Sequence, residues 1–207
     1  MFDTEFGIAS LVLKEIPYKG IAYIIIREAW EPENLLKECM SFCRMVGADI
    51  ICAAGHELLE RYPLYTSVYE MRGDAIVDTA DLKSLFPVTE VSVTRWREIY
   101  NEKMRPIDNA ATLTAFDEKR ILESGGAYFV HQDGELLGIG WLDDAELLAV
   151  ASAKPGMGRT VMNTLMSLVE GDMMRLEVAS TNEKAIHLYE KLGFLKTREI
   201  SRWYRLS

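Results

Sequence analysis

The chain has 207 residues, which is enough for one large domain or two small ones. Because 49% of the residues are hydrophobic, a packed core can form. The formal net charge of −9 argues against nucleic acid as a partner, since phosphate binding needs a basic surface, and no apolar run approaches the roughly 20 residues that span a bilayer.

The first residues, Met1–Glu5, are acidic and lack the charged and apolar regions of a signal peptide. The three cysteines, Cys39, Cys43 and Cys52, cannot all pair with one another, and no neighbouring histidine or cysteine gives zinc-ligand spacing. We therefore expect a cytoplasmic protein with reduced thiols, no metal ion and no membrane contact.

The first half predicts a strand–helix–strand unit. Strands are expected at 6–13 and 20–26, and the second is apolar throughout, as in a strand covered on both faces. A helix follows from Pro32 to Gly47, and then a strand at 49–53, which should lie parallel to the strand at 20–26. A helical turn at 56–62 and a strand at 64–71 complete this half.

Residues 74–86 have the pattern of a connector, so we divide the chain into an α/β unit at 1–86 and a second domain at 87–207. The second domain begins with helices at 96–104 and 113–122. Strands at 128–131 and 135–141 are joined by Asp133-Gly134, a strong hairpin signal. Trp96 and Tyr100, one helical turn apart, either border a substrate pocket or pack in the core.

A glycine loop follows the next strand. The apolar run Leu147–Ala151 predicts a buried strand, residues 152–158 a loop, and Val161, Leu165 and Leu168 one face of a helix. Glycines let the backbone approach a phosphate, and the free N–H groups of a first helical turn point at it. The loop Gly156, Met157, Gly158, Arg159 and Thr160 therefore predicts an anion cradle, with Lys154 and Arg159 as flanking cations.

A second motif lies at Asn182–Phe194. It follows the strand 175–179, begins at Asn182 as a helix N-cap and ends at Gly193. The residues Asn182, Ala185, Leu188, Tyr189, Lys191, Gly193 and Phe194 match the pattern N-x-x-A-x-x-L-Y-x-K-x-G-F. With the glycine loop before it, this segment resembles the GNAT acyltransferase superfamily over about residues 88–207. The loop departs from the family pattern at Ala153, where a cation is usual, and Lys154 would replace that cation.

The resemblance implies a fold, a co-substrate and a site. The fold would be a mixed, strongly twisted sheet flanked by helices, of class α/β (α+β). Acetyl-CoA would bind with its pyrophosphate at the glycine loop and its pantetheine along Ala149, Val150 and Ala151, next to Asn182 and Ala185. Tyr189 would be the general acid at the sulfur. Glu146 would be the base, with Glu177 as a second choice, although position alone favours an ordinary strand-end charge for Glu146.

The first half repeats the order of elements in the second. Where the second half has Gly156 and Gly158, the first has Arg27–Glu33, with three carboxylates and no glycine. One hypothesis is that residues 1–86 form a truncated GNAT-like unit that does not bind CoA, and the alternative is an unrelated α/β extension.

The expected function is direct transfer of an acetyl group from acetyl-CoA to a primary amine, on a small molecule or a peptide, by a monomer or homodimer. The acidic charge favours a cationic acceptor of this kind. The alternative is an inactive GNAT-fold scaffold or acyl-CoA sensor.

Overall fold

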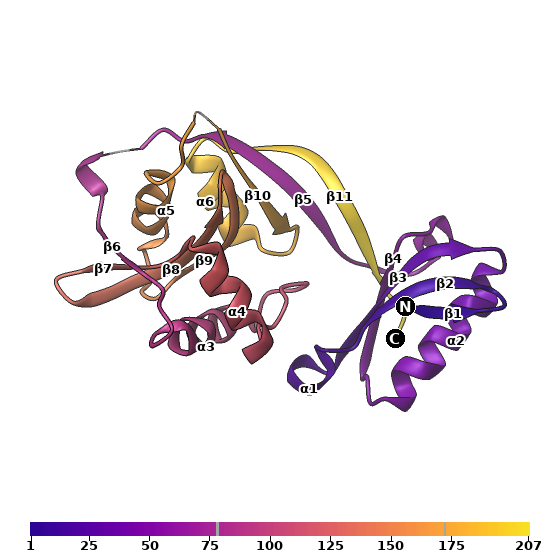
Figure 1. Ribbon diagram of the computed structural model, residues 1–207. Coiled ribbons are helices and arrows are strands. Elements are labelled where there is room, and N and C mark those ends of the chain that lie inside the picture. The colour runs from indigo at the N-terminus through magenta and orange to yellow at the C-terminus, as the bar shows by residue number, and fades with distance from the viewer. Residues whose placement is uncertain (78, 172) are drawn as a thin grey trace. The chain divides into compact units, whose positions relative to one another are not determined.

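The computed structural model describes residues 1–77, 79–171 and 173–207, and it forms two compact units (Figure 1). The first unit comprises Met1–Val68 and Glu199–Ser207, and the second comprises Tyr69–Arg198. This division differs from the predicted boundary at residue 86, because two long strands, β5 (Leu64–Asp74) and β11 (Leu195–Arg205), contribute residues to both units.

The first unit contains the predicted strand–helix–strand element. Strand β3 (Ile21–Ala29) leads through α2 (Pro32–Met45) to β4 (Ile50–Ala54), and β3 and β4 are parallel, as predicted. Strands β1 (Phe2–Thr4) and β2 (Gly7–Val12) add antiparallel neighbours to β3. A short helix, α1 (Ile16–Lys19), precedes β3, and a 3₁₀ turn, η1 (Glu57–Arg61), follows β4.

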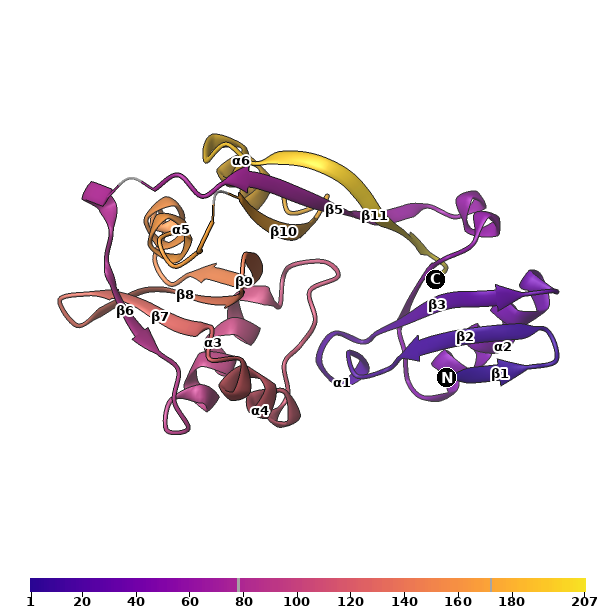
Figure 2. The same ribbon diagram turned by 45° about the horizontal axis from the view of Figure 1, so that its top comes forward.

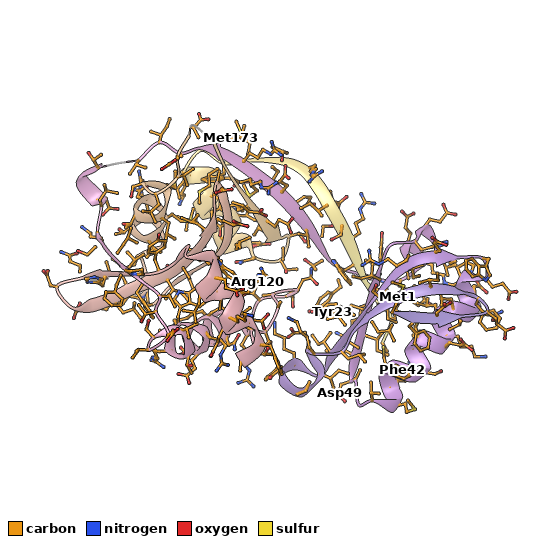
Figure 3. The ribbon with its side chains drawn as sticks, in the orientation of Figure 1. Met1, Tyr23, Phe42, Asp49, Arg120 and Met173 are labelled. Atoms are coloured by element: carbon orange, nitrogen blue, oxygen red, sulfur yellow. The ribbon has the colours of Figure 1, made fainter. Side chains whose placement is uncertain are left out.

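The core of this unit lies between α2 and its strands. Leu35, Leu36, Cys39 and Cys43 of α2 are buried against β3 and β4, because they recur at helical spacing on one face. Figure 3 labels Phe42 on the same helix, and its ring lies 5.3 Å from that of Phe2. All three cysteines are buried, and none forms a disulfide with a described residue.

The second unit is built on a mixed sheet with the strand order β11-β5-β10-β9-β8-β7-β6 (Figure 2). Its remaining strands are β6 (Ser84–Pro87), β7 (Ala127–Gln132), β8 (Glu135–Asp143), β9 (Glu146–Ser152) and β10 (Met173–Ala179). The pairs from β6 to β9 are antiparallel, and β9 and β10 are parallel. Asp133 and Gly134 turn the β7–β8 hairpin with φ values of 51° and 80°, as their residue types predict.

Helices cover both faces of this sheet. One face packs against α5 (Gly158–Met166) and α6 (Glu183–Lys191) in a cluster that includes Leu147, Leu176 and Phe194. The other face packs against α3 (Val93–Met104) and α4 (Ala115–Ser124), with Trp96 and Trp141 at the centre. The short 3₁₀ turn η2 (Thr79–Asp81) lies beside α5. The mixed, curled sheet between helices is the predicted fold class.

Trp96 belongs to the core and not to a pocket. Its side chain is fully buried, stacks on Tyr100 at 5.8 Å and donates a hydrogen bond to the carbonyl of Tyr128 at 3.0 Å. The pocket interpretation of this aromatic pair is therefore wrong. Helical spacing of aromatics is produced by core packing at least as readily as by a binding surface.

Candidate functional site

The site is organised by a slot between two parallel strands. Among the described residues, β10 pairs with β9 only at the first two residues of β9, Arg175 with Glu146 and Leu176 with Leu147. Beyond these positions no register pair joins the described residues of the two strands, although β9 continues to Ser152 and β10 to Ala179. One edge of β9 therefore keeps backbone groups that no strand satisfies.

The alternation of the ladder shows which groups these are. The N–H of Ala153 donates to Leu137 of β8 at 2.8 Å, so residues 149, 151 and 153 direct their backbone groups towards β8. Val150 and Ser152 then present theirs to the slot. Of the predicted residues Ala149, Val150 and Ala151, only Val150 presents its backbone groups to the slot, because those of the two alanines bond to β8. Ser152 was not predicted, because a single sequence does not fix the register of a strand pair.

A β-bulge closes the slot. Leu142 pairs with Leu147 and Trp141 pairs with Ala149, so Leu148 is an extra residue in β9. The bulge lies one residue beyond the last pair of β9 with β10. It therefore marks the point at which the two strands separate.

The glycine loop lies at the open end of the slot. Gly156 has φ of +82°, a conformation that favours glycine, and a Cβ on Gly158 would lie 2.9 Å from Leu188 of α6. Helix α5 makes its first internal bond from Val161 to Met157, and no described residue accepts the N–H of Gly158, Arg159 or Thr160. Free donors at a helix N-terminus are the geometry that an anion cradle requires.

The expected cations of the cradle differ from one another. Arg159 is exposed and makes no ion pair with a described residue. The ammonium of Lys154 pairs with the carboxylate of Glu135 at the surface, an interaction worth less than about 1 kcal/mol that can be exchanged for a phosphate. The hydroxyl of Thr160 donates to Asp81 Oδ2 at 2.9 Å, so only its N–H is available to a ligand.

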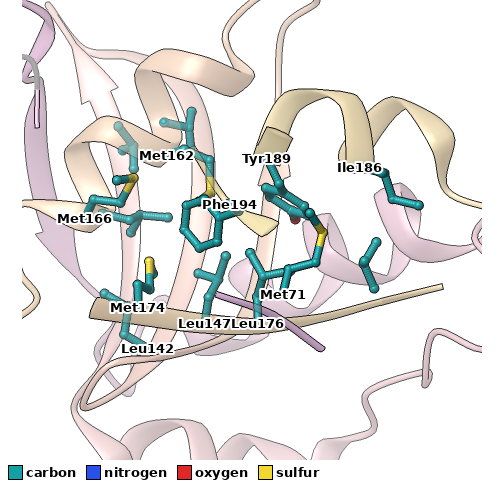
Figure 4. Packing of buried hydrophobic residues seen from close by; sticks show 14 of the residues in the cluster. Met71, Leu142, Leu147, Met162, Met166, Met174, Leu176, Ile186, Tyr189 and Phe194 are labelled. Carbon is teal, nitrogen blue, oxygen red and sulfur yellow. The ribbon is translucent and has the colours of Figure 1, made fainter. Parts of the chain in front are cut away.

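Tyr189 lies on the α6 side of the sheet, in the cluster that contains Met71, Leu176 and Phe194 (Figure 4). Its ring centroid is 6.0 Å from that of Phe194, and its hydroxyl makes no hydrogen bond within the described part of the chain. Burial raises the pKa of Tyr189 to about 12. The phenol is therefore protonated at neutral pH.

Asn182 caps α6, as predicted. Its side-chain oxygen accepts the N–H of Ala185 at 3.3 Å, which satisfies one donor of the first turn. A pocket of about 260 Å³ opens beside this cap, lined by residues 106–108 after α3 and by 181–184. Asn182 and Ala185 thus lie at the end of β10, next to the open end of the slot.

The opposite face of the sheet carries the acidic groups. On β10, Leu176 is buried in the cluster with Tyr189, so Arg175 and Glu177 point to the other face. Glu146 of β9 is on that face too, since Arg175 Nη2 donates to its Oε2 at 2.6 Å. The predicted base is therefore held in an ion pair.

A third strand, β5, contributes a carboxylate to this face, that of Glu70, which the sequence did not predict. Met71 of β5 joins the Tyr189 cluster, which leaves Glu70 on the acidic face, and Glu70 is only 5% exposed. Its carboxylate accepts hydrogen bonds from Arg72, Thr197 and Arg198, and the first two of these chiefly lower its pKa. No motif marks Glu70, because β5 lies far in the sequence from β10, its neighbour in the sheet.

Among residues 1–77, 79–171 and 173–207, no helix is both long and apolar enough to cross a membrane. Within the same residues, no group of three acidic, histidine or cysteine side chains could hold a metal ion.

The fold is that of the GNAT acetyltransferases. A GCN5-related N-acetyltransferase from Anabaena variabilis is similar with a TM-score of 0.63, at 12% identity over 90% of this chain and 56% of that one. A GNAT-family acetyltransferase from Colwellia psychrerythraea gives 0.54, at 14% identity over 89% and 78%. A GCN5-related N-acetyltransferase from Sphaerobacter thermophilus gives 0.55, at 10% identity over 95% and 75%.

The sequence itself matches a family model described as the acetyltransferase (GNAT) family over residues 93–194. This range includes the slot strands, the glycine loop and α6. The C-terminal part of the chain therefore belongs to the GNAT acetyltransferase family. No curated protein matches the sequence.

Proposed function

We propose that the protein transfers an acetyl group directly from acetyl-CoA to a primary amine. The observation that supports this proposal is the slot between β9 and β10, with unpaired backbone groups along one edge and a helix N-terminus at its open end. A long ligand arm with amide groups that leads to a pyrophosphate fits such an arrangement. Family membership supports acyl transfer as the reaction.

The proposal gives the slot two binding functions. The N–H groups of Gly158, Arg159 and Thr160 bind the pyrophosphate, and Arg159 supplies a mobile positive charge. The backbone of Val150 and Ser152 pairs with the pantetheine amides, as a neighbouring strand would. This second function does not depend on side chains, so the apolar sequence of β9 is compatible with it.

Tyr189 is the proton donor to the leaving sulfur. Its phenol has no hydrogen-bond partner among the described residues, and its pKa of about 12 keeps it protonated. It borders the slot through Leu176 and Val178 of β10, which belong to the same cluster. The amine approaches from the other face of the sheet, where the acidic groups lie.

The test is a transfer assay with purified protein, acetyl-CoA and n-propylamine. Free CoA thiol and N-acetylpropylamine should form in equal amounts, without an acetylated protein intermediate in intact mass spectra. Tyr189→Phe should lower kcat by about 10²-fold or more and leave the acetyl-CoA dissociation constant within about threefold, as expected for a lost proton donor. Equal loss of binding and turnover would contradict the role of Tyr189.

Two contacts support the alternative of an inactive scaffold or acyl-CoA sensor. Asp81 accepts the hydroxyl proton of Thr160 in the first turn of α5, and Glu135 pairs with Lys154. Both place a carboxylate near the cradle, where it opposes a pyrophosphate. A protein that binds acetyl-CoA but acetylates no amine would favour the sensor, and Asp81→Asn should then tighten acetyl-CoA binding.

We further propose that the first unit is a truncated copy of the second without a slot. The order β3–α2–β4 repeats β9–α5–β10, and both strand pairs are parallel. Strands β3 and β4, however, stay paired from Ile21 and Ile50 to Ile25 and Ala54, the last residue of β4. The two strands therefore do not separate before β4 ends, as β9 and β10 do, and the segment Arg27–Glu33 has no glycine.

We place the protein in the cytoplasm, where its buried thiols stay reduced. The acceptor is a small amine or a peptide amine, and the protein acts as a monomer or a homodimer. Sedimentation of the purified protein separates the last two possibilities.

A further inference from the structure

Glu177 lies on β10 at the point where this strand separates from β9. The last register pair of the two slot strands joins Leu176 to Leu147, so Glu177 is the first residue of β10 beyond the point of separation. It lies level with the bulge residue Leu148 on β9. Its side chain points to the face opposite the Tyr189 cluster, because Leu176 and Val178 on either side of it belong to that cluster.

The three carboxylates on this face are not equivalent. Glu146, on β9, is bound by Arg175 at 2.6 Å. Glu70, on β5, is bound by Thr197 at 3.0 Å and by two arginines. Glu177 lies on the strand between them and makes no hydrogen bond or ion pair with a described residue.

The charges on this face balance. Three arginines, Arg175, Arg72 and Arg198, accompany the three glutamates, and all three arginines pair with Glu146 or Glu70. Each outer carboxylate is already neutralised by its own partner. Glu177 is left between two carboxylates without a cation of its own, an arrangement that raises the affinity of a carboxylate for a proton.

We propose that Glu177, and not Glu146, takes the proton from the acceptor ammonium. This inference rests on the proposed acetyl transfer, because it assigns a second residue to that reaction. The thioester lies in the slot, Tyr189 donates from the α6 side, and Glu177 accepts from the other side. Acid and base are thereby separated by the reacting carbonyl.

The protons and electron pairs of the proposed transfer balance. The ammonium gives one proton to the carboxylate of Glu177, and the free amine attacks the thioester carbon to form the C–N bond. The nitrogen loses a second proton to water as the adduct collapses and the C–S bond breaks. The sulfur takes a proton from Tyr189, which regains one from solvent, and the proton on Glu177 then leaves to solvent.

The electrostatics of the surroundings support this assignment. Desolvation raises the pKa of Glu177, and the neighbouring charges of Glu146 and Glu70 raise it further, against the opposing effect of Arg198 and Arg175. A base with a raised pKa is better matched to an amine than an ordinary carboxylate, because proton transfer from the ammonium is less unfavourable.

The first test is a ¹³C NMR titration of the protein labelled at glutamate Cδ, which needs no acceptor. The Glu177 signal is the one that disappears in Glu177→Gln. It should titrate above the ordinary glutamate value of about 4.3, and it should shift when acetyl-CoA is added. A midpoint at or below that value, or an unchanged signal while acetyl-CoA demonstrably binds, would overturn the inference and leave the proposed function intact.

The second test compares two probe nucleophiles. n-Propylamine is protonated at neutral pH and needs a base, whereas hydroxylamine is already unprotonated. Glu177→Gln should lower kcat/KM for n-propylamine by about 10²-fold and change transfer to hydroxylamine much less. Glu146→Gln is the matched control and should affect both probes equally and slightly. A larger selective loss in Glu146→Gln would assign the base to Glu146.

Discussion

Arg175 and Glu146 are linked through both backbone and side chain. They are opposite each other in the parallel register of β10 and β9, and Arg175 Nη2 donates a hydrogen bond to Glu146 Oε2 at 2.6 Å. The pair lies one residue before the last register pair, where the slot closes. Glu146, which the sequence suggests as a base, is thus part of an ion pair that links the two strands. The unpaired carboxylate is found two residues further along β10.

Replacing Arg175 by methionine should raise the pKa of Glu177 and have little effect on the free energy of unfolding. The guanidinium of Arg175 is one of the two charges that lower the pKa of Glu177, so its removal should raise that pKa further. Because Arg175 is more than half exposed, loss of its ion pair should cost less than about 1 kcal/mol of unfolding free energy. The ¹³C titration and urea denaturation measure the two effects; an unchanged Glu177 midpoint would contradict the arrangement.

Glu177→Gln should stabilise the protein at neutral pH. The folded state raises the pKa of Glu177, so the charged carboxylate costs stability above the folded pKa, and this cost disappears below the unfolded value of about 4.3. The variant should therefore melt at a higher temperature than the wild type at pH 7, and the difference should shrink towards pH 3.5.

Glu70→Gln is the matched control for that pH dependence. The pKa of Glu70 is lowered, so its contribution to stability is present above the unfolded value and is lost as the pH falls through the folded one. Its variant should melt at a lower temperature than the wild type at pH 7 and approach it in acid. Shifts of the same sign in both variants would refute the difference between the two carboxylates.

Removal of residues 199–207 should unfold the first unit. In this segment Tyr204 pairs with Ala53, and the N–H of Leu206 donates to Ile51 at 2.8 Å. Trp203 packs edge-on against Tyr23, with their ring centroids 5.2 Å apart, and losing such a buried aromatic typically costs about 3–5 kcal/mol. Hydrogen exchange should become fast in 21–29 and 50–54, whereas deletion of Ser207 alone should leave both segments protected.

Much of the fold could be predicted from the sequence, because its signals are local. The helices α2, α3, α4 and α6, the β7–β8 hairpin and the parallel pair β3–β4 follow from periodicity, caps and turn residues. The elements that were missed, β1, α1 and β6, have only three or four residues each, too few to display a period. Leu168, expected on α5, lies beyond its last residue, Met166.

The site was less predictable than the fold. The cradle and Tyr189 occur in contiguous motifs, and a single sequence can display them. The ion pair of Glu146, the bond between Thr160 and Asp81, and the place of Glu70 depend on register and on contacts between distant segments. No periodicity encodes those contacts, so the difference between Glu146 and Glu177 emerges only from the structure.

The central claim is that the slot binds acetyl-CoA with its pyrophosphate at the glycine loop. Thermal unfolding with and without acetyl-CoA tests it on the wild type, Gly156→Glu and the control Gly134→Glu. The two glycines are matched, with φ of +82° and +80° and with no heavy atom within 4 Å of the place a Cβ would take, but Gly134 lies in the β7–β8 turn.

At 100 times its dissociation constant, acetyl-CoA should stabilise the wild type and Gly134→Glu by about 2.7 kcal/mol and leave Gly156→Glu unchanged. Equal stabilisation of all three proteins would place the ligand elsewhere, and no stabilisation of the wild type at millimolar acetyl-CoA would contradict the claim.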